Sequence, residues 1–138
     1  MSTSLEAGME GSCEFKAEGL LLTDVDGSLP KAVLSTPGMI GVMENTATRL
    51  VAPYLDEGAA TVGFEVCIKH VAGAMEGSTC TVSATLREVV DGRKLRFDVE
   101  VREAERTIGV GTHERRVIDV ARHAERTGAQ PEPGQPRT

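Results

Sequence analysis

The sequence predicts an α+β fold in which one curved antiparallel sheet wraps around a single long helix. Three observations predict it: an apolar stripe of helical period over residues 36–54, a two-residue period from Thr61 onward, and the order of these segments. One strand precedes the helix and four follow it. The helix and the sheet have no other layer to pack against, so their apolar faces have to bury one another.

The helix is expected to begin at Ser35-Thr36-Pro37. A hydroxyl at the cap accepts a hydrogen bond from a free amide, and a proline in the first turn has no amide proton to lose. The helix should run to about Tyr54, and Pro53 should bend or end it. The predicted apolar stripe consists of Met39, Ile40, Met43, Ala47, Leu50, Val51 and Tyr54.

Glu44 lies at the edge of this stripe, beside Ile40 and Val51, rather than opposite it. Two interpretations stay open. A long carboxylate at such an edge can reach water, as charged side chains commonly do. It can also face a cleft in which a partly desolvated acid has a chemical role.

The strands are predicted from the alternation of apolar and polar residues. The first is expected over residues 12–18, ahead of a loop or short helix over residues 20–35. Three further strands should bury Val62, Phe64, Val66 and Ile68; Cys80, Val82, Ala84 and Leu86; and Leu95, Phe97, Val99 and Val101. Asp91-Gly92 predicts a hairpin turn, and residues 106–119 should form the last strand.

A single domain is expected over residues 1–123, because a chain of 138 residues is long enough to bury one core. Residues 124–138 contain three Pro, two Gly and two Gln, but no aliphatic side chain larger than Ala. Such a composition predicts a disordered tail.

The composition argues against several classes of partner. The net charge of −6 and the scarcity of aromatic residues argue against nucleic acid and against an anionic membrane surface. The three cysteines form no CxxC pair and the three histidines no HExxH motif, so neither a disulfide framework nor a metal site is expected. Residues 1–11 lack the pattern of a signal peptide, and no apolar run could span a bilayer, so the expected location is cytoplasmic.

Four short features could carry chemistry, although each has a plain structural explanation when taken alone. Thr36 is then most simply a helix cap, and Gly63 marks a β-bulge or a close approach of the backbone. His70 continues the inward parity of its strand, where a histidine is usually a residue at the edge of the core. GTHERR, residues 111–116, is then a strand end with solvated charges.

Taken together, the stretches TPGMIGVME, GFEVCIKHVA and GVGTHERRVI resemble the fluoroacetyl-CoA thioesterase family, small acyl-CoA thioesterases of the hot-dog fold. The resemblance covers most of residues 10–120 and includes the VAPYL run at residues 51–55. The spacings also agree, with eight residues from Thr36 to Glu44 and seven from Gly63 to His70. Several matched runs in the same order are more specific than any one of them.

The resemblance implies an acyl-CoA thioesterase that works as a homodimer, with active sites at the subunit interface. It implies catalytic roles for Thr36, Glu44 and His70, a lining role for Gly63, and a place near the acyl group for Arg115. No cofactor or metal is implied, because CoA is part of the substrate. Glu44 would either activate water or attack the carbonyl itself, and the sequence does not choose between these.

One departure from the family concerns the acyl group. The family enzyme that is specific for fluoroacetate has phenylalanines in its lid, whereas residues 20–34 contain no aromatic side chain. We therefore expect a small or short-chain acyl-CoA, with fluoroacetyl-CoA a doubtful substrate. The alternative is a non-hydrolytic acyl-CoA-binding module of the same fold, but the three polar positions favour hydrolysis. Hydration or dehydration of an acyl thioester normally needs an Asp/His arrangement that is not seen.

Overall fold

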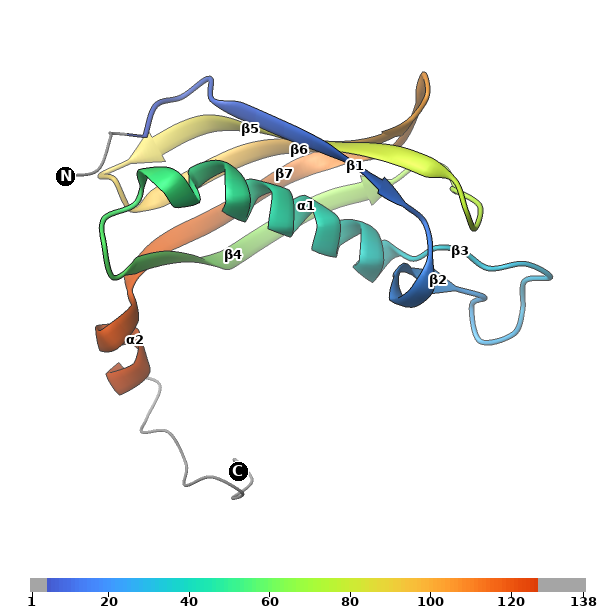
Figure 1. Ribbon diagram of the computed structural model, residues 1–138, viewed down its shortest axis with the longest axis horizontal. Coiled ribbons are helices and arrows are strands. Elements are labelled where there is room, and N and C mark those ends of the chain that lie inside the picture. Colours follow the sequence, from blue (N-terminus) through green and yellow to red (C-terminus); the bar gives the residue numbers. More distant parts are fainter. Residues whose placement is uncertain (1–4, 127–138) are drawn as a thin grey trace.

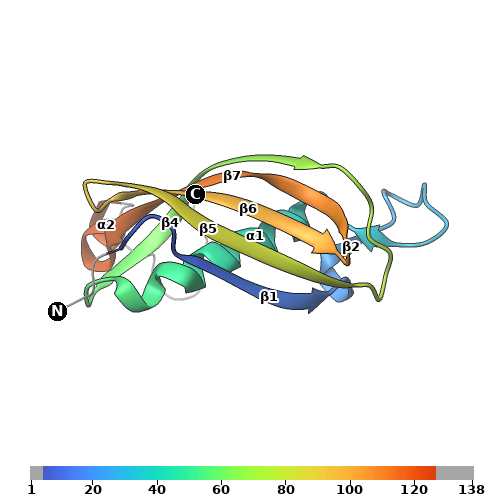
Figure 2. The ribbon, with the colours of Figure 1, turned by 90° about the horizontal axis from the view of Figure 1, so that it is seen from above.

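The computed structural model describes residues 5–126. Its elements follow the chain in this order: β1 (Glu10–Lys16), η1 (Gly19–Leu21), β2 (Leu22–Thr23), β3 (Val33–Leu34), α1 (Thr36–Val51), η2 (Ala52–Tyr54), β4 (Ala59–His70), β5 (Thr79–Val90), β6 (Lys94–Glu103), β7 (Arg106–Asp119) and α2 (Val120–Arg126). Five strands form one antiparallel sheet in the order β1-β5-β6-β7-β4. Figures 1 and 2 show this sheet curving over α1. The predicted fold class is confirmed.

The start of α1 is fixed by a side-chain cap. The Ser35 hydroxyl accepts a hydrogen bond from the Gly38 amide at 2.9 Å, and Pro37 occupies the first turn. Thr36 is therefore not the cap, and its hydroxyl is free for another partner. At the other end, α1 stops at Val51 and continues as the single 3₁₀ turn η2, which contains Pro53.

The core lies between α1 and the sheet. Four residues of the predicted helical stripe are fully buried: Met39, Met43, Ala47 and Val51. They belong to one cluster with the inward side chains of β5 and β6, namely Cys80, Val82, Ala84, Leu86, Leu95, Phe97, Val99 and Val101. Each large apolar side chain buried in this way contributes about 1.5–3 kcal/mol relative to exposure to water.

A β-bulge in β4 changes which residues of this strand face α1. The register against β7 shifts between Gly63 and Glu65, so the parity of the strand reverses there. The prediction that Phe64 shares a face with Val66 is therefore wrong. Phe64 is 59% exposed and lies on the outer face, where the Arg116 guanidinium stacks 3.6 Å from its ring centroid.

After the bulge, Val66, Ile68 and His70 point toward α1, as predicted. Val66 pairs with His113, Ile68 with Gly111 and His70 with Gly109 on β7. Before the bulge, Thr61 and Gly63 face α1 in place of Val62 and Phe64. The structure thus bears out the bulge that was one of the two interpretations of Gly63.

Two peripheral segments contain regular structure beyond the loop or short helix predicted for residues 20–35 and the disordered tail predicted from residue 124. Residues 19–35 contain η1 and the two-stranded sheet of β2 and β3, whose connecting loop projects from the body of the molecule (Figure 1). At the other end, α2 runs to Arg126, three residues past the predicted domain boundary. Residues 127–138, the rest of the predicted tail, lie outside the described residues. No helix among residues 5–126 is long and apolar enough to cross a membrane.

Candidate active site

Thr36 and His70 form a polar pair where α1 begins and β4 ends. Thr36 is the first residue of α1 and His70 is the last residue of β4. The Thr36 hydroxyl lies 2.8 Å from His70 Nδ1, a hydrogen bond whose direction depends on the tautomer of the ring. The second ring nitrogen, Nε2, is buried and has no hydrogen-bond partner among residues 5–126. Among these residues, His70 therefore uses one of its two ring nitrogens in hydrogen bonding.

Glu44, Gly63 and Arg115 form the second group. Glu44 Oε2 lies 3.9 Å from Arg115 Nη1, and the carboxylate side chain is 39% exposed while the arginine side chain is 8% exposed. A Cβ atom added to Gly63 would lie 3.0 Å from Glu44 Oε2. The missing side chain at Gly63 thus lets the acid lie against the backbone of β4.

Arg115 is held by three hydrogen-bond partners besides this ion pair. Its Nε donates to the Thr61 hydroxyl at 2.8 Å and its Nη2 donates to the Thr61 carbonyl at 3.0 Å. Its Nη1 lies 3.2 Å from His113 Nε2. Burial lowers the pKa of the Arg115 guanidinium, and the charge of Glu44 opposes that shift. The hydrogen bonds offset much of what burying a cation costs.

His113 completes this cluster. Its Nδ1 lies 2.8 Å from the Glu65 carbonyl, and its ring stacks on Phe97 with 6.1 Å between centroids. The pKa of His113 is lowered, chiefly because the ring is buried and also because Arg115 is close. The Glu65 hydrogen bond and the Glu44 charge oppose this shift.

Within one chain the two groups stay apart. Thr36 and Glu44 are eight residues apart on α1, which corresponds to about 12 Å of helix rise. Gly63 and His70 are seven residues apart on β4, or roughly 20 Å. One chain therefore joins Thr36 to His70, and Glu44 to Gly63 and Arg115, but does not bring the two groups into contact.

Sequence reasoning did not single out Thr61 and His113. Alternation could have identified them, because residues two apart on a strand point to the same face. Thr61 comes two residues before Gly63, and His113 comes two residues before Arg115. The parity of β4 could not be used without knowing the position of the bulge. His113 lies in the GTHERR run, but the sequence predicted a role for Arg115 of this run and none for His113.

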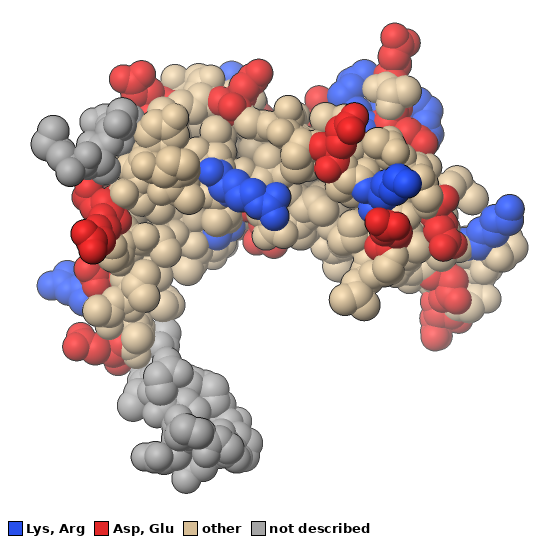
Figure 3. All heavy atoms as spheres, viewed as in Figure 1, with Lys and Arg blue, Asp and Glu red and all other residues tan. Residues whose placement is uncertain are grey.

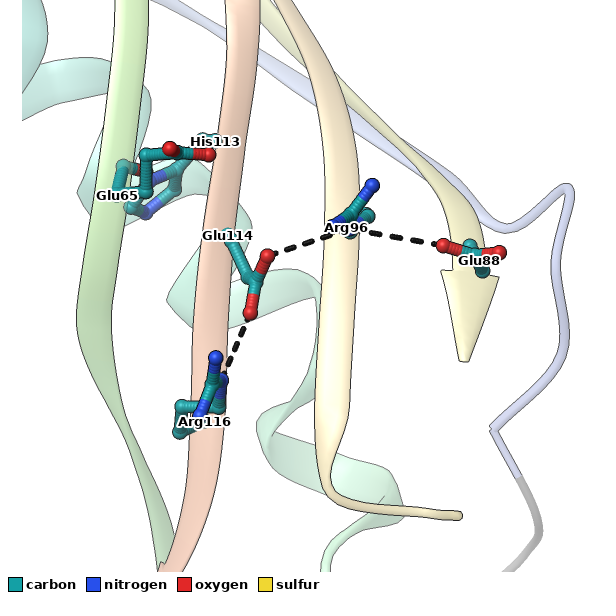
Figure 4. A network of polar contacts seen from close by, with 6 residues as sticks. All are labelled: Glu65, Glu88, Arg96, His113, Glu114 and Arg116. Atoms are coloured by element: carbon teal, nitrogen blue, oxygen red, sulfur yellow. Dashed lines mark hydrogen bonds and ion pairs between the residues drawn. The ribbon is translucent and has the colours of Figure 1, made fainter. Parts of the chain in front are cut away.

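The outer face of the sheet carries charges that pair with one another. Glu114 accepts from Arg116 at 2.7 Å and from Arg96 at 3.2 Å, and Arg96 lies 3.6 Å from Glu88 (Figure 4). Arg87 pairs with Asp98 at 2.9 Å. The opposite side of the molecule, which carries α1 and is seen in Figure 3, also has Lys and Arg interspersed with Asp and Glu. This pattern is typical of a solvated surface, and it gives no support to a broad anion-binding face.

Comparison with known proteins gives consistent results. The model of the family "Fluoroacetyl-CoA-specific thioesterase" (FlK) matches residues 20–121. A fluoroacetyl-CoA thioesterase from Streptantibioticus cattleyicolor is 43% identical over 86 residues. That alignment spans 62% of this chain and 61% of the relative's own length.

Solved structures extend the similarity over nearly the whole chain. A structure of the fluoroacetyl-CoA thioesterase FlK has a TM-score of 0.81 and 31% identity, and the match covers 94% of this chain and 100% of that one. A mutant of FlK in complex with fluoroacetate and CoA has a TM-score of 0.78 and 31% identity, covering 86% and 99%. A thioesterase superfamily member from Thermus thermophilus has a TM-score of 0.79 and 25% identity, covering 88% and 90%. The chain has the hot-dog fold and belongs to the fluoroacetyl-CoA-specific thioesterase family.

Proposed function

We propose that this protein is an acyl-CoA thioesterase that hydrolyses a small or short-chain acyl-CoA to the free acid and CoA. One observation carries the proposal: a partly exposed carboxylate, Glu44, lies against the bare backbone of Gly63 and beside the buried cation of Arg115. A module that only binds acyl-CoA has little use for a carboxylate at that position. No contact in the described chain favours that alternative.

The chemistry needs an oxygen nucleophile, a stabilised negative charge and a route for the leaving thiolate. Glu44 either removes a proton from water as the water attacks the thioester carbonyl, or attacks the carbonyl itself to give an anhydride that water then opens. In both routes the C–S bond breaks and CoA leaves as the thiolate. Arg115 keeps a positive charge 3.9 Å from Glu44 Oε2, on the side of the acid that lies toward the sheet.

Thr36 and His70 suit the carbonyl and the leaving group. Thr36 lies at the amino end of α1, where amide groups and the helix dipole favour a developing negative charge. His70 can carry a proton to the thiolate, and its hydrogen bond with Thr36 orients the ring. These two roles require the pair to lie near Glu44.

A homodimer formed through β4 would bring the two groups together. Among residues 5–126, β4 is an edge strand that pairs only with β7, and Val66 on it is 43% exposed. Two copies of β4 can pair antiparallel about a two-fold axis at Cys67, with Phe64 as the extra residue of each bulge, so that directly opposed residues share a face. That register places His70 of the partner subunit opposite Gly63, with both side-chain positions on the face that α1 covers. Each active site would then take Glu44 from one subunit and the Thr36–His70 pair from the other.

The acyl group should be small, and fluoroacetyl-CoA is a doubtful substrate. The family enzyme named for fluoroacetyl-CoA has lid phenylalanines, whereas the loop between β2 and β3 has no aromatic residue. No cofactor is needed, because CoA enters with the substrate. A CoA thioester substrate also accords with the predicted cytoplasmic location.

The test is release of free thiol from acetyl-, propionyl-, butyryl-, long-chain and fluoroacetyl-CoA, measured with a thiol reagent. We expect turnover of the short-chain substrates and a loss of about 10²-fold or more in kcat for Glu44→Gln. Glu57→Gln, which changes an exposed acid beyond α1, should keep wild-type turnover. Binding of acyl-CoA without thiol release would contradict hydrolysis. A preference for long chains would contradict the proposed acyl group.

A further inference from the structure

We infer that His113 is a positioning residue, whose neutral imidazole fixes the Arg115 guanidinium beside Glu44 and holds the β4 bulge against the same acid. The ring is 3% exposed and faces α1 from β7. Figure 4 shows it next to Glu65 on the neighbouring strand. Its effect on turnover rests on the proposed function, whereas its hydrogen-bonding state does not.

The contacts of His113 define its tautomer. The Glu65 carbonyl can only accept a hydrogen bond, so Nδ1, at 2.8 Å, must carry the proton and donate. Arg115 has donors and no acceptor, so its Nη1, at 3.2 Å, donates to Nε2. Both nitrogens are thereby used, one as donor and one as acceptor.

This arrangement determines the position of the arginine. Thr61 takes hydrogen bonds from Nε and Nη2, and His113 takes one from Nη1, so all three guanidinium nitrogens are held. The planar guanidinium cannot turn while these bonds persist. Its Nη1 is also the atom that lies 3.9 Å from Glu44 Oε2. His113 thus acts on Glu44 through Arg115.

The other nitrogen of the ring acts on the strand. Glu65 is the residue at which pairing with β7 resumes after the bulge, and its carbonyl is the acceptor for Nδ1. A Cβ atom on Gly63 would lie 3.7 Å from His113 Cε1 and 3.0 Å from Glu44 Oε2. By holding Glu65, the ring therefore keeps the glycine backbone where the carboxylate rests.

Protonation of Nε2 would undo the arrangement. It would remove the acceptor for Arg115 and place a second cation 3.2 Å from the guanidinium. The charged groups that face the ring are Arg115 on its own strand and Glu44 on α1, while β6 contributes the apolar ring of Phe97. The lowered pKa of His113 accords with a ring that stays neutral at physiological pH.

Two substitutions of similar size separate the two hydrogen bonds. In His113→Gln, the amide oxygen takes the place of Nε2 and can accept from Arg115. In His113→Asn, the amide nitrogen takes the place of Nδ1 and can donate to Glu65, but nothing reaches Arg115. We expect kcat to fall by about 10- to 100-fold in His113→Asn, with a much smaller fall in His113→Gln and little change in KM. His123→Gln, on α2, should behave as wild type.

Equal kcat in both variants, whether lost or kept, would overturn the positioning role through Arg115. Unfolding curves of both variants show whether a loss of kcat comes only from a less stable fold. An inactive wild-type protein would refute the proposed function and leave the tautomer of His113 to be measured directly.

That measurement is the ¹⁵N spectrum of the imidazole rings across a pH titration, which needs no substrate. We expect His113 to keep its proton on Nδ1 and to gain the second proton only below the usual histidine range. Replacing Arg115 with Met should raise the pKa of His113, because a like charge is removed, and Glu44→Gln should lower it. A proton on Nε2 in the neutral ring, or a His113 pKa that neither substitution moves, would overturn the inference.

Discussion

At Gly63, the absence of a side chain decides where an acid can lie. The Glu44 carboxylate is 39% exposed, so water can reach it, yet a Cβ atom on Gly63 would lie 3.0 Å from Oε2 and push it by a few tenths of an ångström. The Arg115 cation, which is almost fully buried, lies 3.9 Å from the same oxygen. The acid thus has a defined position while it stays open to a substrate.

Gly63→Ala should therefore separate activity from stability. The added Cβ at 3.0 Å pushes against the free end of Glu44, which can swing aside, so the free energy of unfolding should change by less than about 1 kcal/mol. The displaced carboxylate should lower kcat by about 10-fold or more. Thiol release and chemical denaturation measure the two quantities.

Gly41→Ala is the matched control. A Cβ atom at Gly41 meets nothing within 4 Å, and alanine in a helix interior stabilises by up to about 1 kcal/mol over glycine. Full activity in Gly63→Ala would show that the position of Glu44 against the backbone is irrelevant to turnover.

Single residues were predicted well where the signal was local. Ser35-Thr36-Pro37 located the start of α1 within one turn, because caps and proline act over that range. The choice between Ser35 and Thr36 as the cap could not be made, since both are hydroxyl residues. Thr61 and His113 were missed because their roles depend on Arg115, which is distant from Thr61 in sequence and close only in the fold.

At the scale of elements, β4 shows how one inserted residue redirects a strand. Alternation assigns Val62 and Phe64 to the buried face, but the bulge after Gly63 turns them outward and leaves Val66 and His70 inward. Alternation alone cannot show where a register shifts. Gly63 was the one local sign of it, since glycine within a strand often marks a bulge or a close approach.

The row of ion pairs on the outer face gives the sheet a pH-dependent stability. The hydrogen bond from Arg116, with Arg96 also close, holds the pKa of Glu114 below its ordinary value of 4.5. A carboxylate whose pKa is lowered in the folded state stabilises the fold above its unfolded pKa, and this contribution is lost as the pH falls through the folded value. Glu114→Gln should therefore lower Tm at pH 7, and the difference from wild type should vanish in acid.

Asp98→Asn provides the comparison for this prediction. Asp98 pairs with Arg87, but the two side chains are 53% and 64% exposed, so water screens the pair and the change in Tm should be small. Thermal unfolding of both variants from pH 7 to pH 3 measures this. A difference between Glu114→Gln and wild type that grows in acid would contradict the assigned sign.

At the scale of the whole molecule, the fold followed from the sequence because one amphipathic helix and one alternating sheet leave a single way to bury both. The complete site could not be derived from the fold of one chain. Thr36 and Glu44 lie on one helix about two turns apart, and no rearrangement of a single chain brings them together without breaking that helix. The proposed homodimer resolves this by supplying the second group from another copy.

The central claim, a site shared between two subunits, is tested most directly with a mixed dimer. Glu44→Gln and His70→Ala, carried on subunits with different tags, should each give an inactive homodimer. A purified dimer with one subunit of each kind has one site with both groups intact and one site with neither, so we predict about half of the wild-type turnover per dimer. If each site were built within one chain, every site would keep one defect and the mixed dimer would be as inactive as its parents.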